Sequence, residues 1–253
     1  TDSTMARLIY SVLFYLLLPL IILRLLFRGL KSSGYRSRWA ERLGLVASTA
    51  DKRIIWLHAV SVGETLAAAP LVRALQEQYP QHRLLVTCMT PTGSERIQAV
   101  FGDSVEHCYA PYDMPDALSR FLATVNPEIL IIMETELWPN TIAACHRRNI
   151  PVVLANARLS QKSALGYSRV KPLVKPMLES MTAVVAQHHD DGARFIDLGL
   201  PGSVLSISGN IKFDLTLDAP LKQYAQQLGT QWRGAEGRLI WLAASTHRGE
   251  DEI

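Results

Sequence analysis

One carboxylate, Glu64, ends the stretch Ser61-Val62-Gly63-Glu64, which directly follows an apolar run at 54–59. The run predicts a buried strand, the glycine a tight turn, and the residues after Glu64 a helix. Open α/β sheets bind ligands beyond the carboxyl ends of their strands, so a carboxylate here can face a bound ligand. The structural alternative is that Glu64 only complements the helix dipole, and a lone glutamate favours that alternative.

A second pair of carboxylates, Glu134 and Glu136, follows the apolar run at 129–133. Two carboxylates two residues apart are costly to bury, so they indicate either an exposed loop or a binding site. Capping of a helix that begins near Pro139 accounts for Glu136 but accounts less well for Glu134.

A third loop contains Thr90, Thr92 and Gly93 ahead of a predicted helix. Hydroxyl groups and free backbone N–H groups at a helix start suit an anion. Capping of that helix by a threonine explains the same residues equally well. The loop therefore predicts either an anion site or a helix cap.

A fourth loop contains Gly209 and Asn210, with Lys212 just beyond. Glycine allows close approach to the backbone, and the lysine can meet a phosphate. A plain turn is the favoured alternative for this short signal. His58 lies inside the first predicted strand and is interpreted as a hydrogen-bonded core histidine.

These loops fall between apolar strands and helices that alternate along the chain. Strands alternating with helices of this length predict a parallel sheet covered on both faces, an α/β fold. The strands are expected at 54–59, 83–88, 105–108, 129–133, 151–155, 183–186 and 204–207. The helices are expected at 67–78, 94–100, 115–123, 138–148, 170–181 and 190–198.

The N-terminal stretch from Leu8 to Leu23 is uncharged and apolar. About 20 apolar residues span a bilayer core, so the sequence predicts an uncleaved membrane anchor over residues 1–30. Pro19 leaves open whether this helix crosses the bilayer or lies along it. Basic residues after the apolar run replace the small residues that a cleaved signal peptide needs. They also predict that the rest of the chain faces the cytoplasm.

Charge is concentrated beside this anchor. Between Arg24 and Arg42 lie six basic residues and one acid, Glu41, while the net charge of all 253 residues is only +3. The local excess predicts attraction to anionic lipids of the inner leaflet, at roughly 1 kcal/mol per basic residue. The small total charge does not indicate nucleic-acid binding.

The regular alternation of predicted strands and helices ends after Asn210. Residues 31–215 are expected to form one Rossmann-like domain, and residues 216–253 a linker, a helix and the opening strand of a second domain at 238–243. The three cysteines have no metal-ligand spacing and suit a reducing compartment, so no metal site is expected.

Five motifs closely resemble the Kdo transferases of lipopolysaccharide synthesis, and the resemblance covers nearly the whole chain. The motifs are His-Ala-Val-Ser-Val-Gly-Glu (58–64), Met-Thr-Pro-Thr-Gly-Ser-Glu-Arg (89–96), Met-Glu-Thr-Glu-Leu-Trp-Pro-Asn (133–140), Ala-Asn-Ala-Arg-Leu-Ser (155–160) and Ala-Ser-Thr-His-Arg-Gly-Glu (244–250).

The resemblance implies a glycosyltransferase of the GT-B fold, built from two facing Rossmann-like domains. Such an enzyme moves 3-deoxy-D-manno-octulosonic acid (Kdo) from CMP-Kdo to a lipid A precursor, with inversion and without a metal or cofactor. It works at the cytoplasmic face of the inner membrane. The N-terminal domain binds the acceptor, and the C-terminal domain, which this chain only begins, binds most of the donor.

The resemblance also assigns the loop residues. It implies that Glu64 is the general base for the acceptor hydroxyl. The implied acceptor-binding residues are Ser61, Val62, Gly63, Thr90, Thr92, Gly93, Glu134 and Glu136. The implied donor-binding residues are Gly209, Asn210, Lys212, Ser245, Thr246, His247 and Glu250.

Two other functions fit the same sequence. The chain can be a membrane-docked module that binds a lipid acceptor without catalysis. It can also belong to another GT-B transferase that uses a different nucleotide sugar.

Overall fold

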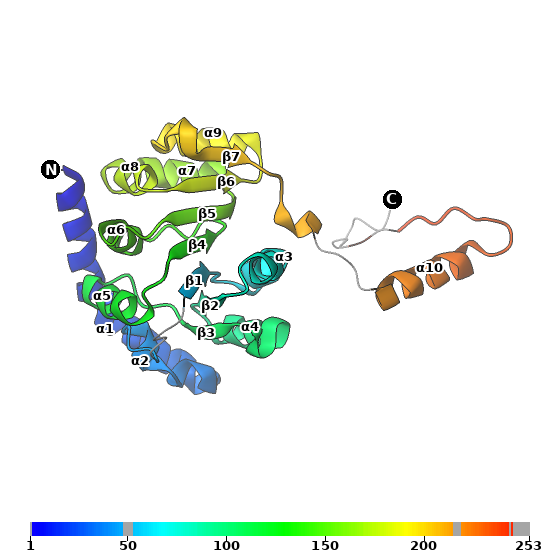
Figure 1. Cartoon of the computed structure of the whole chain (residues 1–253), viewed down its shortest axis with the longest axis horizontal. Coiled ribbons are helices and arrows are strands. Elements are labelled where there is room, and N and C mark those ends of the chain that lie inside the picture. Colours follow the sequence, from blue (N-terminus) through cyan, green and yellow to red (C-terminus); the bar gives the residue numbers. More distant parts are fainter. Residues whose placement is uncertain (1, 48–52, 215–218, 243, 245–253) are drawn as a thin grey trace. The chain divides into compact units, whose positions relative to one another are not determined.

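Seven parallel strands form the sheet at the centre of the first of two units, Thr1–Asp214 and Leu215–Ile253 (Figure 1). The structure, a computed structural model, describes residues 2–47, 53–214, 219–242 and 244. The sheet order is β3-β2-β1-β4-β5-β6-β7, which confirms the predicted α/β fold with a parallel sheet. The strands are β1 (Arg53–His58), β2 (His82–Cys88), β3 (Glu106–Tyr109), β4 (Ile129–Met133), β5 (Val152–Ala157), β6 (Ala183–Ala186) and β7 (Leu205–Ile207).

Helices cover both faces of this sheet. One face packs against α3 (Val62–Gln78) and α4 (Pro91–Phe101). The other face packs against α5 (Pro115–Val125), α6 (Pro139–Arg147), α7 (Gln161–Ser168), α8 (Lys171–Glu179) and α9 (His189–Leu198). The remaining short helices of this unit are η1 (Ser33–Arg36), α2 (Trp39–Arg42), η2 (Gly102–Ser104), η3 (Gly202–Val204) and η4 (Ile211–Asp214).

The central strands β1 and β4 contain continuous apolar runs because both of their faces are buried. On the larger side of the core, Trp56 of β1 packs against Phe121 of α5, with ring centroids 4.8 Å apart. The indole N–H of Trp56 donates to the Thr87 hydroxyl at 2.8 Å, so the one polar atom of this buried ring is satisfied.

The strand order reverses between β1 and β4, which lie side by side in the middle of the sheet. The chain leaves β1 towards β2 on one side and leaves β4 towards β5 on the other, so the connections after β1 and β4 diverge. Such a divergence opens a crevice at the carboxyl edge of the sheet, where open α/β folds bind ligands. Glu64, in the first turn of α3, follows β1, and Glu134, in the loop before α6, follows β4.

The N-terminal apolar stretch forms a single helix, α1 (Asp2–Lys31), that continues through Pro19. By length and composition the segment Ser3–Lys31 can cross a membrane, and its most apolar 18-residue stretch has a mean hydropathy of 2.3. In the structure it runs past α6 and α8, and its Phe14 packs against Tyr112.

The second unit contains α10 (Ala219–Arg233), as predicted, but not the predicted strand at 238–243. Residues 238–242 have no regular structure, and Ala243 lies outside the described residues. Leu239 and Trp241 are exposed. A parallel strand needs a neighbouring strand and an apolar face to cover it, and among residues 219–242 the only regular element is α10.

Candidate functional site

Glu64 and Ser61 are hydrogen-bonded to each other at the start of α3. Ser61 is the N-cap, and its hydroxyl accepts from the Glu64 N–H at 3.2 Å. In return, Oε2 of Glu64 accepts from the Val60 N–H at 2.8 Å. This arrangement closely resembles a capping box, so the structural alternative for Glu64 is realised. The expected tight turn at Gly63 is wrong, because Gly63 lies in the first helical turn, where a side chain would meet nothing closer than 3.8 Å.

The environment of Glu64 also gives it the properties of a base. Its side chain is only 6% exposed, and this burial raises the pKa of its carboxyl. Hydrogen bonds from Ser61 and Val60 oppose the shift, whereas the nearby charge of Glu134 adds to it. A carboxylate with a raised pKa accepts a proton more readily, as general-base catalysis requires.

Glu134 follows directly after β4, the strand that pairs with β1. Its backbone adopts a left-handed conformation with φ 56°, and its N–H donates to the Ala155 carbonyl at 2.9 Å. Its carboxylate lies 3.6 Å from the ammonium group of Lys212. Left-handed conformations of residues other than glycine are strained, and such strain is concentrated at functional sites.

Glu136 follows in the same loop, and its Oε2 accepts from the indole N–H of Trp138 at 3.1 Å. Burial raises the pKa of Glu136 to about 7, and the charges of Glu64 and Glu134 contribute to this shift. The structure therefore brings Glu64, Glu134 and Glu136 together as one electrostatically coupled group.

The structural alternative for Glu136, capping of α6, is not realised, because Asp113 caps this helix from a distant segment. The Asp113 carboxylate accepts from the N–H of Asn140 at 2.9 Å and from the N–H of Thr141 at 2.7 Å. It also accepts from the Thr141 hydroxyl at 2.7 Å. These N–H groups have no partner within the helix, so a buried carboxylate satisfies the start of α6.

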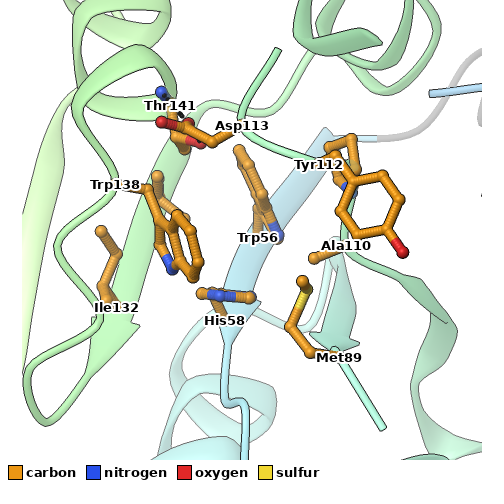
Figure 2. A pocket seen from close by; sticks show the side chains of 11 residues that line it. Trp56, His58, Met89, Ala110, Tyr112, Asp113, Ile132, Trp138 and Thr141 are labelled. Carbon is orange, nitrogen blue, oxygen red and sulfur yellow. Dashed lines mark hydrogen bonds between the residues drawn. The ribbon is translucent and has the colours of Figure 1, made fainter. Parts of the chain in front are cut away.

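A small cavity of about 20 Å³ lies beside this cap, enough for about one water molecule (Figure 2). Figure 2 shows His58 between Trp138 and Met89. His58 is buried, and its Nδ1 lies 2.9 Å from the Thr87 hydroxyl, which confirms the interpretation of a hydrogen-bonded core histidine. Burial lowers the pKa of His58 to about 4, so it is neutral at pH 7.

The loop after β2 lies against the loop after β1. Thr90 is the N-cap of α4 and accepts from the Gly93 N–H at 3.1 Å, so its capping role is confirmed. The Thr92 hydroxyl lies 3.3 Å from that of Thr90. A side chain at Gly93 would lie 3.3 Å from the Val60 carbonyl, so the glycine allows the two loops to approach. Anion binding at this loop stays a prediction.

The loop after β7 reaches the same edge. Gly209 has a positive φ of 84°, and the Asn210 side chain accepts from the Lys212 N–H at 3.0 Å, which confirms a turn. Lys212 then meets Glu134, so predicted donor-side and acceptor-side residues are neighbours. Ser245, Thr246, His247 and Glu250 lie outside the described residues.

Asn156 is a further polar residue of this edge, to which the sequence assigned no role. It is 3% exposed, has φ 53°, and accepts from the Ile211 N–H at 3.1 Å. Its amide nitrogen is buried and has no partner within the described part of the chain. A buried donor without a partner costs about 1–3 kcal/mol and calls for a ligand or water. The only sequence signal was its place in the motif at 155–160.

Metal-ligating side chains do not gather at this edge. Across residues 2–47, 53–214, 219–242 and 244, no group of three or more His, Cys, Asp or Glu side chains is arranged to hold a metal ion. The polar groups that converge here are carboxylates, amides, hydroxyls and one ammonium group, which can bind a sugar and move a proton.

Glu136→Gln is expected to change how stability depends on pH. The pKa of Glu136 rises to about 7 on folding, mainly through burial, so the folded state binds a proton that the unfolded state has lost above about pH 4.5. The free energy of unfolding therefore falls as pH rises through this window. Glutamine removes this dependence, so the variant should be more stable than the parent above pH 7, by about 1–3 kcal/mol after allowance for partial exposure.

Denaturant unfolding at pH 5, 6, 7 and 8 measures this effect. Glu95→Gln, the same substitution at an exposed position of α4, is the matched control and should leave the pH curve unchanged. Parallel pH curves for the parent and Glu136→Gln would contradict the raised pKa of Glu136.

The sequence of this chain is similar to those of one family of known proteins. A family model described as 3-Deoxy-D-manno-octulosonic-acid transferase (kdotransferase) matches residues 37–215. A 3-deoxy-D-manno-octulosonic acid transferase of Haemophilus influenzae is 46% identical over 98% of this chain and 58% of its own length. The transferase of Bordetella pertussis is 35% identical over 98% of this chain and 58% of its own length.

Among solved structures, a UDP-GlcNAc 2-epimerase from Neisseria meningitidis bound to UDP-GlcNAc is similar with a TM-score of 0.49, at 13% identity over 71% of this chain and 51% of that chain. The chain spans somewhat more than half the length of the transferases named above. The family model covers most of the chain, including the loops that follow β1, β2, β4 and β7. The chain therefore belongs to the 3-deoxy-D-manno-octulosonic-acid transferase (kdotransferase) family.

Proposed function

We propose that the native protein transfers Kdo from CMP-Kdo to a hydroxyl group of a lipid A precursor, with inversion at the anomeric carbon. The observation that carries this proposal is the convergence of Glu64, Glu134 and Glu136 beyond the carboxyl ends of β1 and β4. Family membership supplies the sugar and the reaction class. The donor nucleotide and the lipid acceptor follow from the motifs that the chain shares with this family.

Glu64 is the proposed general base. The acceptor oxygen attacks the anomeric carbon of Kdo, its proton passes to Glu64, and the bond from that carbon to the phosphate oxygen breaks. CMP leaves as a stable anion, so this step needs a base but no partner acid. Glu64 suits the role because burial raises the pKa of its carboxyl and Val60 fixes one carboxylate oxygen.

The other two carboxylates bind and position the acceptor in this proposal. Glu136 has a pKa of about 7 and accepts from Trp138, so near neutral pH it can donate to a sugar oxygen when protonated. Glu134 is tied to Lys212. The negative charge of Glu134 disfavours ionisation of Glu64 and thereby strengthens Glu64 as a proton acceptor. Ser61, Val62, Gly63, Thr90, Thr92 and Gly93 line the same side.

The donor side of the proposed site begins at the loop after β7. Lys212, held by Asn210 and paired with Glu134, is the cation placed to meet the CMP phosphate. Gly209 lets the chain turn there. The Ser245–Glu250 stretch is proposed to complete the donor side. In this proposal residues 31–215 form the acceptor-binding domain, and residues 216–253 begin the donor domain of a GT-B enzyme. The protein is proposed to act at the cytoplasmic face of the inner membrane.

The test is a transfer assay with the native protein in full, labelled CMP-Kdo and a lipid A precursor. Label is expected to move to the lipid, and unlabelled CMP should inhibit the transfer far more strongly than UDP. Stronger inhibition by UDP would assign the protein to transferases that use another nucleotide sugar. Lipid binding without any transfer would leave a non-catalytic lipid-acceptor module and overturn the proposal.

A further inference from the structure

Helix α1 has one face on the protein and one face away from it. Its buried and half-buried positions recur every three or four residues, as on one side of a helix. Phe14, Leu18, Ile21 and Leu25 pack against the cluster formed around Tyr112. The inner face is therefore a packed protein interface rather than a lipid-facing surface.

Polar contacts fix the position of α1 along the surface of the sheet-containing unit. Ser11 is 8% exposed, and its hydroxyl accepts from the Asn140 side chain at 3.0 Å. The Tyr10 side chain hydrogen-bonds to Asp113, the residue that caps α6. Tyr15 donates to the carboxylate of Asp116. Because such contacts are satisfied only when the helix docks at one position, they determine how α1 sits on the protein.

The docked length of α1 is greater than the thickness of a bilayer core. Near its start, Ser3 and Arg7 line a cleft shared with Arg147. Near its end, Leu25 packs against the cluster around Tyr112. Ser3 to Leu25 spans about 33 Å of helix, against about 30 Å of hydrocarbon. A crossing helix would have to lose these contacts with the globular part.

The outer face of α1 is a continuous apolar surface. Large apolar side chains along it are about half exposed or more, reaching 68% at Leu16 and 69% at Phe27. Further members of this face are Leu8, Leu13, Leu20 and Leu23. Exposed apolar surfaces of this extent mark sites of interaction with membranes or proteins.

Cations flank both ends of this apolar face. Arg24, Arg28 and Lys31 lie exposed at one end. At the other end Arg7 lies close enough to Arg147 for the two charges to interact, and neither has an acidic partner among the described residues. This pattern matches a helix in the interfacial plane, with phosphates of anionic lipids around it.

We propose that α1 lies in the plane of an anionic leaflet, with its inner face on the protein and its outer face among the upper acyl chains, and does not cross the bilayer. The proposal concerns membrane attachment and holds whether or not the protein transfers Kdo. Ser11 reaches Asn140, four residues beyond Glu136, so the docked helix also sets the position of the candidate site relative to the headgroups.

Topology is tested with the full chain, using Thr4→Cys and Asp103→Cys, which place one exposed cysteine at the start of α1 and one on the globular part. The native cysteines Cys88, Cys108 and Cys145 are buried, so the unmodified chain is the blank. A membrane-impermeant maleimide should label both new cysteines in inverted vesicles and neither in intact cells. Labelling of Thr4→Cys from the opposite side to Asp103→Cys would overturn the proposal.

Depth and lipid preference are tested separately. Spin labels at Leu16, Leu20 and Leu23 should all report a similar shallow depth, about 5–10 Å below the headgroups, whereas a crossing helix gives depths that change steadily with position. Binding should favour phosphatidylglycerol over phosphatidylcholine vesicles, and each of Arg24→Gln and Arg28→Gln should weaken it about fivefold. A dimer that hides the outer face and leaves vesicle binding at background would also overturn the proposal.

Discussion

Glu64→Gln is expected to lower the rate of Kdo transfer by about 10²–10⁴-fold and to change the free energy of unfolding by less than about 1 kcal/mol. Glutamine keeps the shape of the side chain, its carbonyl can still accept from the Val60 N–H, and glutamine also occurs in capping boxes. The amide, however, cannot take the proton of an attacking hydroxyl. Transfer rates and denaturant unfolding on the same preparation measure the two effects.

Glu77→Gln is the matched control, because Glu77 is an exposed glutamate in the last turn of the same helix, α3. It should leave both transfer and stability unchanged. A Glu64→Gln variant that keeps more than a tenth of the parent rate would contradict the assignment of the base. A variant that loses stability together with activity would show that the cap at Ser61, rather than proton transfer, explains the loss.

Much of the fold can be predicted because burial on both faces imposes a simple pattern. The runs at 129–133 and 183–186 were predicted to the residue as β4 and β6, and the other strands to within two residues. Helix α7 was missed, since it contains no fully buried residue and its apolar period is weak. The strand at 238–243 was wrong, because an apolar run does not become a strand without a neighbour to pair with.

The site could be located from the sequence only in outline. Glu64, Glu134 and Glu136 were placed at one edge because loops after parallel strands share an edge. Their coupling, and the pKa of about 7 at Glu136, depend on distances that no local pattern encodes. The contact from Asp113 to Asn140 likewise joins residues 27 positions apart. The sequence suggested Glu136 only as an alternative cap of this helix, and no local pattern points to Asp113.

Asp113→Ala is expected to lower the free energy of unfolding by about 3–5 kcal/mol. The carboxylate is nearly fully buried and accepts from the N–H groups of Asn140 and Thr141, which alanine would leave buried without partners at about 1–3 kcal/mol each. Loss of the contact with Tyr10 adds to this, since it also loosens the docking of α1. Urea unfolding measures the change, and Tm should fall with it.

Asp103→Ala, at an exposed position of η2, is the control and should change stability by less than about 0.5 kcal/mol. Asp113→Asn separates charge from hydrogen bonding, because one amide oxygen can still accept while the NH₂ group faces donors. The asparagine variant should therefore fall between the parent and Asp113→Ala. If Asp113→Ala costs less than about 1 kcal/mol, the start of α6 does not depend on this cap. The register between α1 and the loop of Glu134 and Glu136 would then have to come from the Ser11–Asn140 hydrogen bond and apolar packing.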